Sequence, residues 1–166
     1  MAGSGRHDLP TSAELAIWRA HIEVVEMVRA RLEAQLHRES HLSSPDYKVL
    51  LALNEADTHS MRPSELAAFI NWERSRLSRH LGRMEARGLV RRVPHAEDAR
   101  GADVILTDAG ARAYRASTAP HLRAIKSVFL DALTPELLSQ VEAVDAALWA
   151  HLDREPQSDP ESATPP

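Results

Sequence analysis

The sequence contains no cysteine, and aromatic residues make up only 4% of its 166 positions. The missing cysteine excludes disulfide bonds, thiolate metal sites and cysteine-based oxidant sensing. With so few aromatic side chains, the 43% of apolar residues is mostly Leu, Val, Ile and Ala, a composition typical of packed helices. The first residues lack the apolar region of a secretory signal, and no run approaches the ~18 apolar residues of a membrane span. We therefore expect a mainly helical, cytoplasmic protein without a membrane partner.

The motifs of common enzymes are also missing. The six glycines form neither G-x-G-x-x-G nor G-x-S-x-G, and there is no zinc signature. Among the nine histidines, His37 and His41 have the i, i+4 spacing of a helical zinc pair. However, Glu39 stands two positions after His37, not next to it as in H-E-x-x-H. We therefore expect no enzymatic activity, no cofactor and no metal site.

Hydrophobic periodicity divides the chain into a short lead, one domain and a tail. Residues 1–11 read as a flexible lead, and residues 154–166, rich in Pro, Ser and acids, lack the apolar content of a core. Helical spacing and capping residues predict helices over about 12–38, 44–55, 63–70 and 73–87, and two more between Thr107 and residue 152. L-V-R-R-V and A-D-V-I-L-T predict a hairpin of two short strands. The expected fold is mainly α with a small β-hairpin (α+β), in a single domain over residues 12–153.

Two of the predicted helices lie close together before the hairpin. The first contains S-E-L-A-A-F-I, and the second begins about three residues later, so the chain must turn sharply between them. Asn71 tolerates the left-handed backbone that such a turn needs. A short helix, a tight turn and a second helix form a helix-turn-helix, to which the hairpin adds a wing. The sequence thus predicts a winged helix-turn-helix over about residues 44–106.

The second of these helices lies in a basic segment of an acidic chain. The formal net charge is −4, yet residues 73–92 hold seven Arg and two Glu, a charge of +5, which leaves −9 for the rest. On a helical wheel one side is apolar (Leu77, Leu81 and Met84), and an arc of about 100° beside it is basic: Arg76, Arg79, His80, Arg83 and Arg87. Charge alone would fit a solvated face. In a helix-turn-helix it favours a recognition helix that enters the major groove of DNA.

The hairpin loop, P-H-A-E-D-A-R-G-A, carries a second basic candidate. Arg100 lies at its tip, and Asp98 is close enough in sequence to orient the guanidinium group. Gly101 permits the backbone to bend into the second strand. An arginine at this place can reach the negative potential of a neighbouring minor groove. The alternative is a surface turn with incidental charges.

These motifs together resemble the MarR (multiple antibiotic resistance regulator) family. The matching runs are S-E-L-A, S-R-L-S-R-H-L-G-R-M-E-A-R-G-L-V-R-R, D-A-R-G and L-T-D-A-G, and with the flanking helices the resemblance covers about residues 12–152. It implies an obligate homodimer, held by the helices at about 12–38 and 107–152. Such a dimer binds a palindromic operator in double-stranded DNA and usually represses transcription. The resemblance further implies a loss of DNA affinity when a small ligand binds, typically a phenolic or other organic anion.

The resemblance also assigns site residues. Those on the positions that touch bases and phosphates are Arg74, Ser75, Arg76, Ser78, Arg79 and Arg83. The wing arginine corresponds to Arg100 and its partner acid to Asp98. The family's ligand pocket lies between the dimerisation helices and the winged domain, and the residues that could face it are Trp18, His21, Asp46 and Tyr47. Trp18 also fits the apolar stripe of the first helix as a core residue. The resemblance gives no role to Trp72 and Glu73.

One alternative function remains open. A winged helix can serve as a protein–protein interaction module without operator binding. The salt dependence of binding discriminates between the two functions. Phosphate contacts release counterions and lose affinity steeply with salt, whereas an apolar protein interface changes little.

Overall fold

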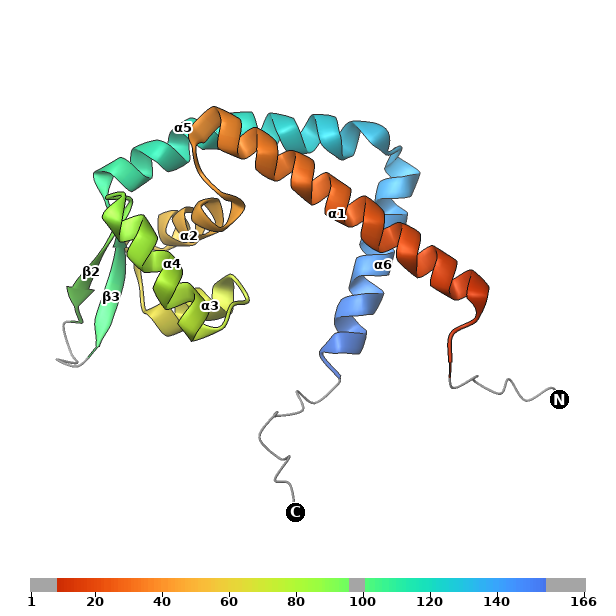
Figure 1. Cartoon of the computed structure of the whole chain (residues 1–166), viewed down its shortest axis with the longest axis horizontal. Coiled ribbons are helices and arrows are strands. Elements are labelled where there is room, and N and C mark those ends of the chain that lie inside the picture. The colour runs from red at the N-terminus through yellow and green to blue at the C-terminus, as the bar shows by residue number, and fades with distance from the viewer. Residues whose placement is uncertain (1–8, 96–100, 155–166) are drawn as a thin grey trace, which may run out of the picture. The chain divides into compact units, whose positions relative to one another are not determined.

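The computed structural model describes residues 9–95 and 101–154 (Figure 1). Its elements are α1 (Ser12–Ser40), α2 (Ser44–Glu55), β1 (Ser60–Met61), α3 (Pro63–Phe69), α4 (Arg74–Ala86), β2 (Val90–Pro94), β3 (Ala102–Leu106), α5 (Asp108–Val128), the 3-10 turn η1 (Leu130–Ala132) and α6 (Pro135–Leu152). They form two compact units, Met1–Val128 and Phe129–Pro166. Within the described ranges, no helix is both long and apolar enough to cross a membrane. The predicted fold class, mainly α with a β-hairpin wing, is confirmed.

Side chains satisfy the free backbone N–H groups at the starts of α1 and α2. At α1, Thr11 Oγ1 accepts from the N–H of Glu14 (3.3 Å), and the Glu14 carboxylate accepts from the N–H of Thr11 (2.7 Å). Ser43 and Asp46 form the same reciprocal pair at α2, over 3.2 and 2.9 Å. Ser43 therefore caps α2, and Ser44 is its first residue.

Left-handed residues separate α3, α4 and the wing. Asn71, between α3 and α4, has φ 54°, which confirms the tight turn of the helix-turn-helix. Gly88, after α4, has φ 70°. There the chain reverses, and the N–H of Leu89 donates to the carbonyl of Met84 over 3.0 Å. α4 is thus bounded by two backbone positions that few residue types tolerate.

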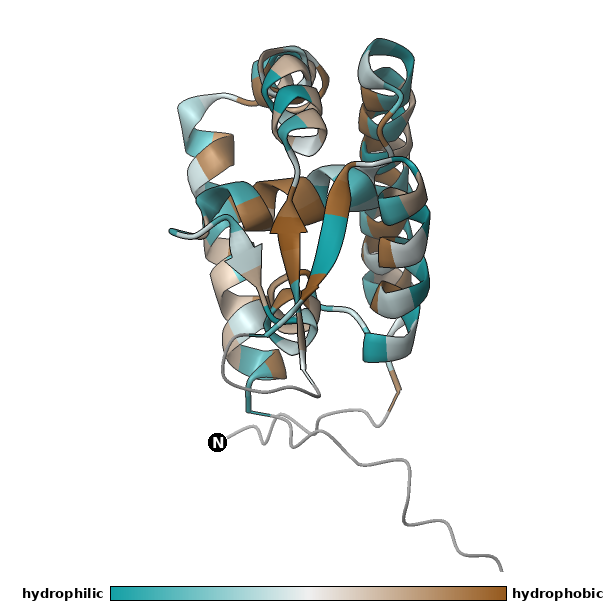
Figure 2. Ribbon diagram, turned by 90° about the vertical axis from the view of Figure 1, so that its left-hand side faces the viewer, coloured by the Kyte–Doolittle hydropathy of each residue, from teal (hydrophilic) through white to brown (hydrophobic). Residues whose placement is uncertain are grey.

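The wing belongs to a three-stranded antiparallel sheet in the order β1-β3-β2. β2 pairs with β3 from Val90 opposite Leu106 to Pro94 opposite Ala102, and β1 pairs Ser60 with Ile105. Figure 2 shows the two longer strands side by side, one mostly apolar and the other partly polar. The sequence did not predict β1. Two residues are too few to show the alternation by which strands are predicted.

Thr107 ties the wing to α5. Its Oγ1 donates to the carbonyl of Gly88 (2.7 Å) and accepts from the N–H of Gly110 (3.0 Å). The side chain of Thr107 therefore caps α5. A Cβ on Gly110 would collide with the carbonyl oxygen of Leu89. The glycine of L-T-D-A-G is therefore needed for the close approach of α5 to the end of α4.

The core of the first unit lies where α2, α3, α4 and the sheet meet. Its fully buried side chains come from all of these elements and include Val49, Leu50, Leu53, Leu66, Leu77, Leu81, Met84, Val90 and Val104. α1 packs against α5, yet Leu36 is its one buried residue among those described. The apolar stripe predicted on α1 is otherwise largely exposed, as at Trp18 and Val25.

Candidate nucleic-acid interface

α4 is fixed to the domain by one side and presents the others to solvent. Leu77, Leu81 and Met84 are all at most 1% exposed, as the helical wheel predicts. At 100° per residue, Ser75 and Arg79 point away from this buried stripe, and both are exposed. Arg79 makes no hydrogen bond or ion pair with any residue that the structure describes. Its guanidinium group is therefore available to a partner outside the chain.

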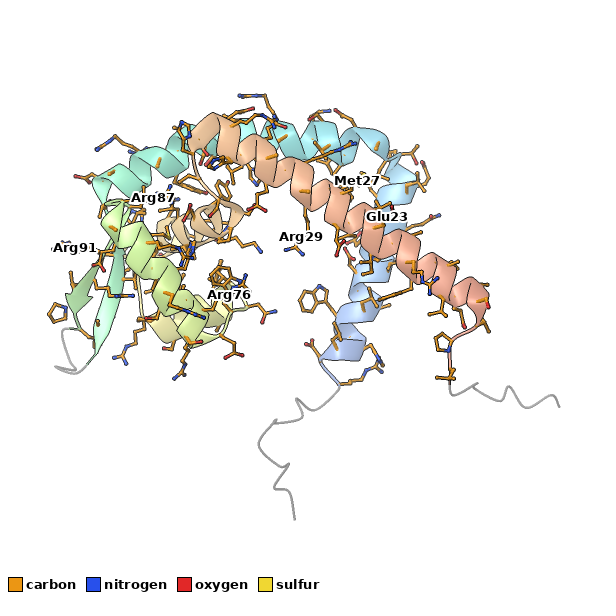
Figure 3. The ribbon with its side chains drawn as sticks, viewed as in Figure 1. Glu23, Met27, Arg29, Arg76, Arg87 and Arg91 are labelled. Atoms are coloured by element: carbon orange, nitrogen blue, oxygen red, sulfur yellow. The ribbon has the colours of Figure 1, made fainter. Side chains whose placement is uncertain are left out.

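On one flank of α4 the side chains are linked in a row. The guanidinium carbon of Arg76 lies 4.0 Å from the ring centre of Trp72, a cation–π contact. The edge of the same indole packs against His80, with ring centres 5.4 Å apart. His80 Nδ1 accepts from Arg83 Nη2 over 3.0 Å. Figure 3 shows Arg76 on the side of α4 away from β2, and Arg91 on the side of the strands. Trp72 and His80 thus hold two of the predicted DNA-binding arginines.

Asp46, at the start of α2, contacts this flank of α4 from the interior of the domain. Its Oδ2 accepts from Arg87 Nη1 over 2.7 Å, and its Oδ1 lies 3.1 Å from His80 Nε2, in a contact too bent for a well-aligned hydrogen bond. Asp46 is only 2% exposed. Burial alone would raise the pKa of its carboxyl group. His80, Arg87 and Ser43 outweigh that effect and hold the pKa well below its ordinary value. Asp46 is therefore charged at neutral pH and neutralised by Arg87, which follows α4.

These contacts correct the predicted basic arc. His80 was placed there with the arginines, but it is 6% exposed and faces Asp46. Arg87 stays exposed, but its guanidinium group is held by the domain, because its second nitrogen donates to the carbonyl of His41 over 2.9 Å. Beside them lies a cavity of about 680 Å³ between α4, the start of α2 and the end of α1. Its lining includes three arginines, Arg76, Arg83 and Arg87, and two acids, Glu33 and Asp46.

The other flank of α4 faces α3 and the wing. Arg92 Nη2 donates to the carbonyl of Ser78 over 2.9 Å, which ties β2 to α4. Arg62 Nη2 donates to His95 Nε2 (2.6 Å), and His95 Nδ1 donates to Asp103 (2.8 Å). A second cavity, of about 380 Å³, is lined on this side by Arg62, Ser64, Arg74, Ser78, Arg92 and His95. Basic side chains therefore flank α4 on both sides.

The predicted DNA-contact residues on α4 all have exposed side chains. Arg74, Ser75, Arg76, Ser78, Arg79 and Arg83 are all exposed. Glu73 stands at the N-cap of α4, but its side chain makes no capping hydrogen bond. Asp98 and Arg100, the predicted wing residues, lie outside the described residues. The six residues of α4 are thus accessible to a partner. The structure does not test the prediction for the wing residues.

The four residues predicted for a ligand pocket are not gathered in either of these cavities. Trp18 is 60% exposed on α1, and His21 is exposed one turn later. Tyr47 is buried, with its ring centre 4.6 Å from that of His121. Asp46 alone of the four lines the larger cavity. Their role in binding a ligand stays a prediction.

Sequence reasoning missed the residues that hold the arginines in place. Trp72, Arg76 and His80 follow one another at intervals of four, a helical spacing that could have indicated a shared face. The pairs of Asp46 with Arg87 and of His95 with Asp103 have no such signal, because tertiary contacts and strand pairing create them.

The rings of His37 and His41 lie 6.1 Å apart, and no group of three or more metal-ligating side chains gathers within residues 9–95 and 101–154.

Comparison with known proteins identifies relatives of this chain. The sequence profile of the MarR family matches residues 42–101 of this chain. The crystal structure of AbsC, a MarR family transcriptional regulator from Streptomyces coelicolor, is similar with 32% identity and a TM-score of 0.81, over 90% of this chain and 100% of AbsC. The structure of Sco3205, a MarR family transcriptional regulator from the same organism in complex with DNA, has 32% identity and a TM-score of 0.82, over 91% and 97% of the two chains.

A third relative is known from its sequence. The HTH-type transcriptional regulator PrsX of Escherichia coli is 29% identical to this chain over 107 residues. The matched segment is 64% of each of the two chains, so the chain spans just under two thirds of the length of that regulator.

Proposed function

Because the chain belongs to the MarR family of transcriptional regulators, we propose that it binds double-stranded DNA sequence-specifically through α4. The observation that carries the proposal is the outward side of α4, where Ser75 and Arg79 are exposed between two basic flanks. A helix fits the ~12 Å major groove, and guanidinium groups bind phosphates or guanine edges there. The proposed contacts are the predicted ones: Arg74, Ser75, Arg76, Ser78, Arg79, Arg83 and, from the wing, Arg100 oriented by Asp98.

The finer part of the proposal is a homodimer on a palindromic operator. Apolar side chains are exposed along both units, which supports a partner of the same kind. They include Ile17, Trp18, Ile22, Val24, Val25 and Met27 on α1, Leu122 on α5, and Leu137, Val144, Leu148, Trp149 and Leu152 on α6. A two-fold dimer presents two copies of α4 to half-sites about one helical turn of DNA, or a multiple of it, apart. Bound at a promoter in the cytoplasm, such a dimer represses transcription by occupying the operator.

Regulation by a small organic anion completes the proposed function. The cavity of about 680 Å³ beside α4 has a volume suited to a small ligand, and Trp72, Arg76 and Arg83 line one part of it. A ligand there would compete with DNA for two arginines. Weaker duplex binding upon addition of a hydroxybenzoate would support this part, and unchanged binding at millimolar concentration would contradict it.

The experiment that tests the proposal is the selection of bound duplexes from random DNA. We expect enrichment of a palindrome with two half-sites, and sedimentation of the free protein as a dimer at micromolar concentration. A pool without enrichment would contradict sequence-specific binding. A folded monomer in sedimentation would contradict the dimer alone.

A further inference from the structure

Gly82 occupies the middle of α4, where a glycine destabilises a helix. Within a helix interior, glycine is less favourable than alanine, because its backbone loses more freedom on folding. The backbone of Gly82 has no positive φ that would require glycine. A reason for glycine at this position must therefore come from its surroundings.

The fold itself supplies no such reason. A Cβ built on Gly82 would meet no atom within 4 Å. The contrast with two other glycines is clear, since Gly88 has a left-handed backbone and Gly110 lies against the carbonyl of Leu89. Gly82 is exposed and touches nothing that a methyl group would displace. Alanine at this position would fit the structure of the free protein.

Gly82 lies on the side of α4 that the proposed function turns toward DNA. At 100° per residue it is about 130° around the helix from the middle of the buried stripe. Its neighbours one turn back on the helix surface are Ser78 and Arg79, and Ser75 lies two turns back on the same side; all three are predicted DNA contacts. Two of these neighbours are serines, whose short hydroxyl groups reach a base edge or a phosphate only if the helix backbone comes close.

We propose that Gly82 is the point of closest approach between α4 and the DNA, and that its missing side chain lets Ser75, Ser78 and Arg79 reach their contacts. The inference rests on the proposed function and deepens it, because it assigns a specificity-determining role to a residue without a side chain. The surface of the duplex takes the space that a Cβ would fill. A side chain at position 82 holds the helix away from the groove while leaving the free protein intact.

The test uses Gly82→Ala and Gly82→Gln in the full chain, with duplexes selected by the unaltered protein as the probe. Both variants replace glycine by a better helix former, so we expect the melting temperature to rise by about 1–4 °C. We expect duplex affinity to fall by about tenfold for Gly82→Ala and further for Gly82→Gln. Ala116→Gln adds comparable bulk at an exposed position of α5 and should leave affinity unchanged.

Opposite changes in stability and affinity distinguish this role from a structural one. Equal affinity of Gly82→Ala and the unaltered chain would overturn the inference and leave the proposed function standing. A lower melting temperature of Gly82→Ala would also overturn it, because glycine would then serve the fold. Absence of duplex binding by the unaltered chain would overturn the proposed function, and with it this inference.

Discussion

Asp46 Oδ2 lies 2.7 Å from Arg87 Nη1, so an almost fully buried carboxylate at the start of α2 holds the guanidinium group that follows α4. Through His80 the same carboxylate also reaches the middle of α4. The helix proposed to enter DNA is therefore attached to the domain by two kinds of contact. One is its buried apolar stripe, and the other is the charged anchor formed by Asp46 and Arg87.

Replacing Asp46 with Asn should destabilise the fold by about 2–4 kcal/mol, because Arg87 loses the carboxylate that neutralises it and His80 loses a polar neighbour. Ser43→Ala removes only the capping contact and should cost about 1 kcal/mol. The free energy of unfolding in urea measures both variants. Equal losses would show that Asp46 acts as a cap and not as an anchor.

The lowered pKa of Asp46 gives this anchor a pH dependence. Its carboxyl group binds a proton more readily in the unfolded chain, so its contribution is fully present above the ordinary pKa of about 4 and is lost as the pH falls below it. Acid unfolding of the unaltered chain should therefore be steeper below pH 4 than that of Asp46→Asn. Parallel curves would contradict the charged anchor.

The contact between Trp72 and Arg76 should be measurable as a coupling energy. A double-mutant cycle with Trp72→Leu and Arg76→Ala should give about 0.5–1 kcal/mol in unfolding free energy, the range of partly exposed cation–π pairs. The cycle cancels the apolar packing that Trp72→Leu removes by itself. Strictly additive effects would mean that the indole does not hold the guanidinium group.

Much of this arrangement follows from sequence, and the remainder has a physical cause. Asn71 and Gly88 mark the ends of α4 because few residue types tolerate their backbone, so the boundaries of the helix were predictable. The wheel separated Leu77 from Arg79 correctly. It failed at His80, since a residue at the border of two faces turns toward whichever partner the fold provides, here Asp46.

The long helices show the same limit. α1 was predicted from its apolar stripe, yet within the single chain Val25 and others on that stripe are exposed. Periodicity reports that a face is apolar but not what covers it. A second copy of the chain, as proposed, would reconcile the pattern with the exposure.

His121 should make stability depend on pH in a second, higher window. Burial lowers the pKa of its imidazole, and its Nδ1 is buried without a hydrogen-bond partner among the described residues. The unfolded chain therefore binds the proton more readily, and stability should fall as the pH drops from about 7 through the lowered pKa. His121→Phe keeps a ring beside Tyr47, should raise stability by about 1 kcal/mol and should flatten the curve between pH 5 and 7. An unchanged pH dependence would contradict a neutral imidazole with a buried Nδ1.

Arg79→Ala should weaken duplex binding and reduce its salt dependence, because Arg79 is exposed on the outward side of α4 and makes no pair with the described residues. For each phosphate that is no longer neutralised, the slope of log affinity against log salt should decrease in magnitude by about 0.9. Arg115→Ala removes the same charge from an exposed position of α5 and is the matched control. Equal effects of the two variants would show that net charge matters and the position on α4 does not.

The most direct test of DNA binding through α4 is the affinity of the unaltered chain for a selected duplex, measured between 50 and 200 mM salt. With 6–10 phosphate contacts in the proposed dimer, affinity should fall by about a thousandfold or more over this range. An affinity that stays constant with salt, or no binding of duplex DNA at 50 mM, would contradict the account and favour a protein-binding winged helix.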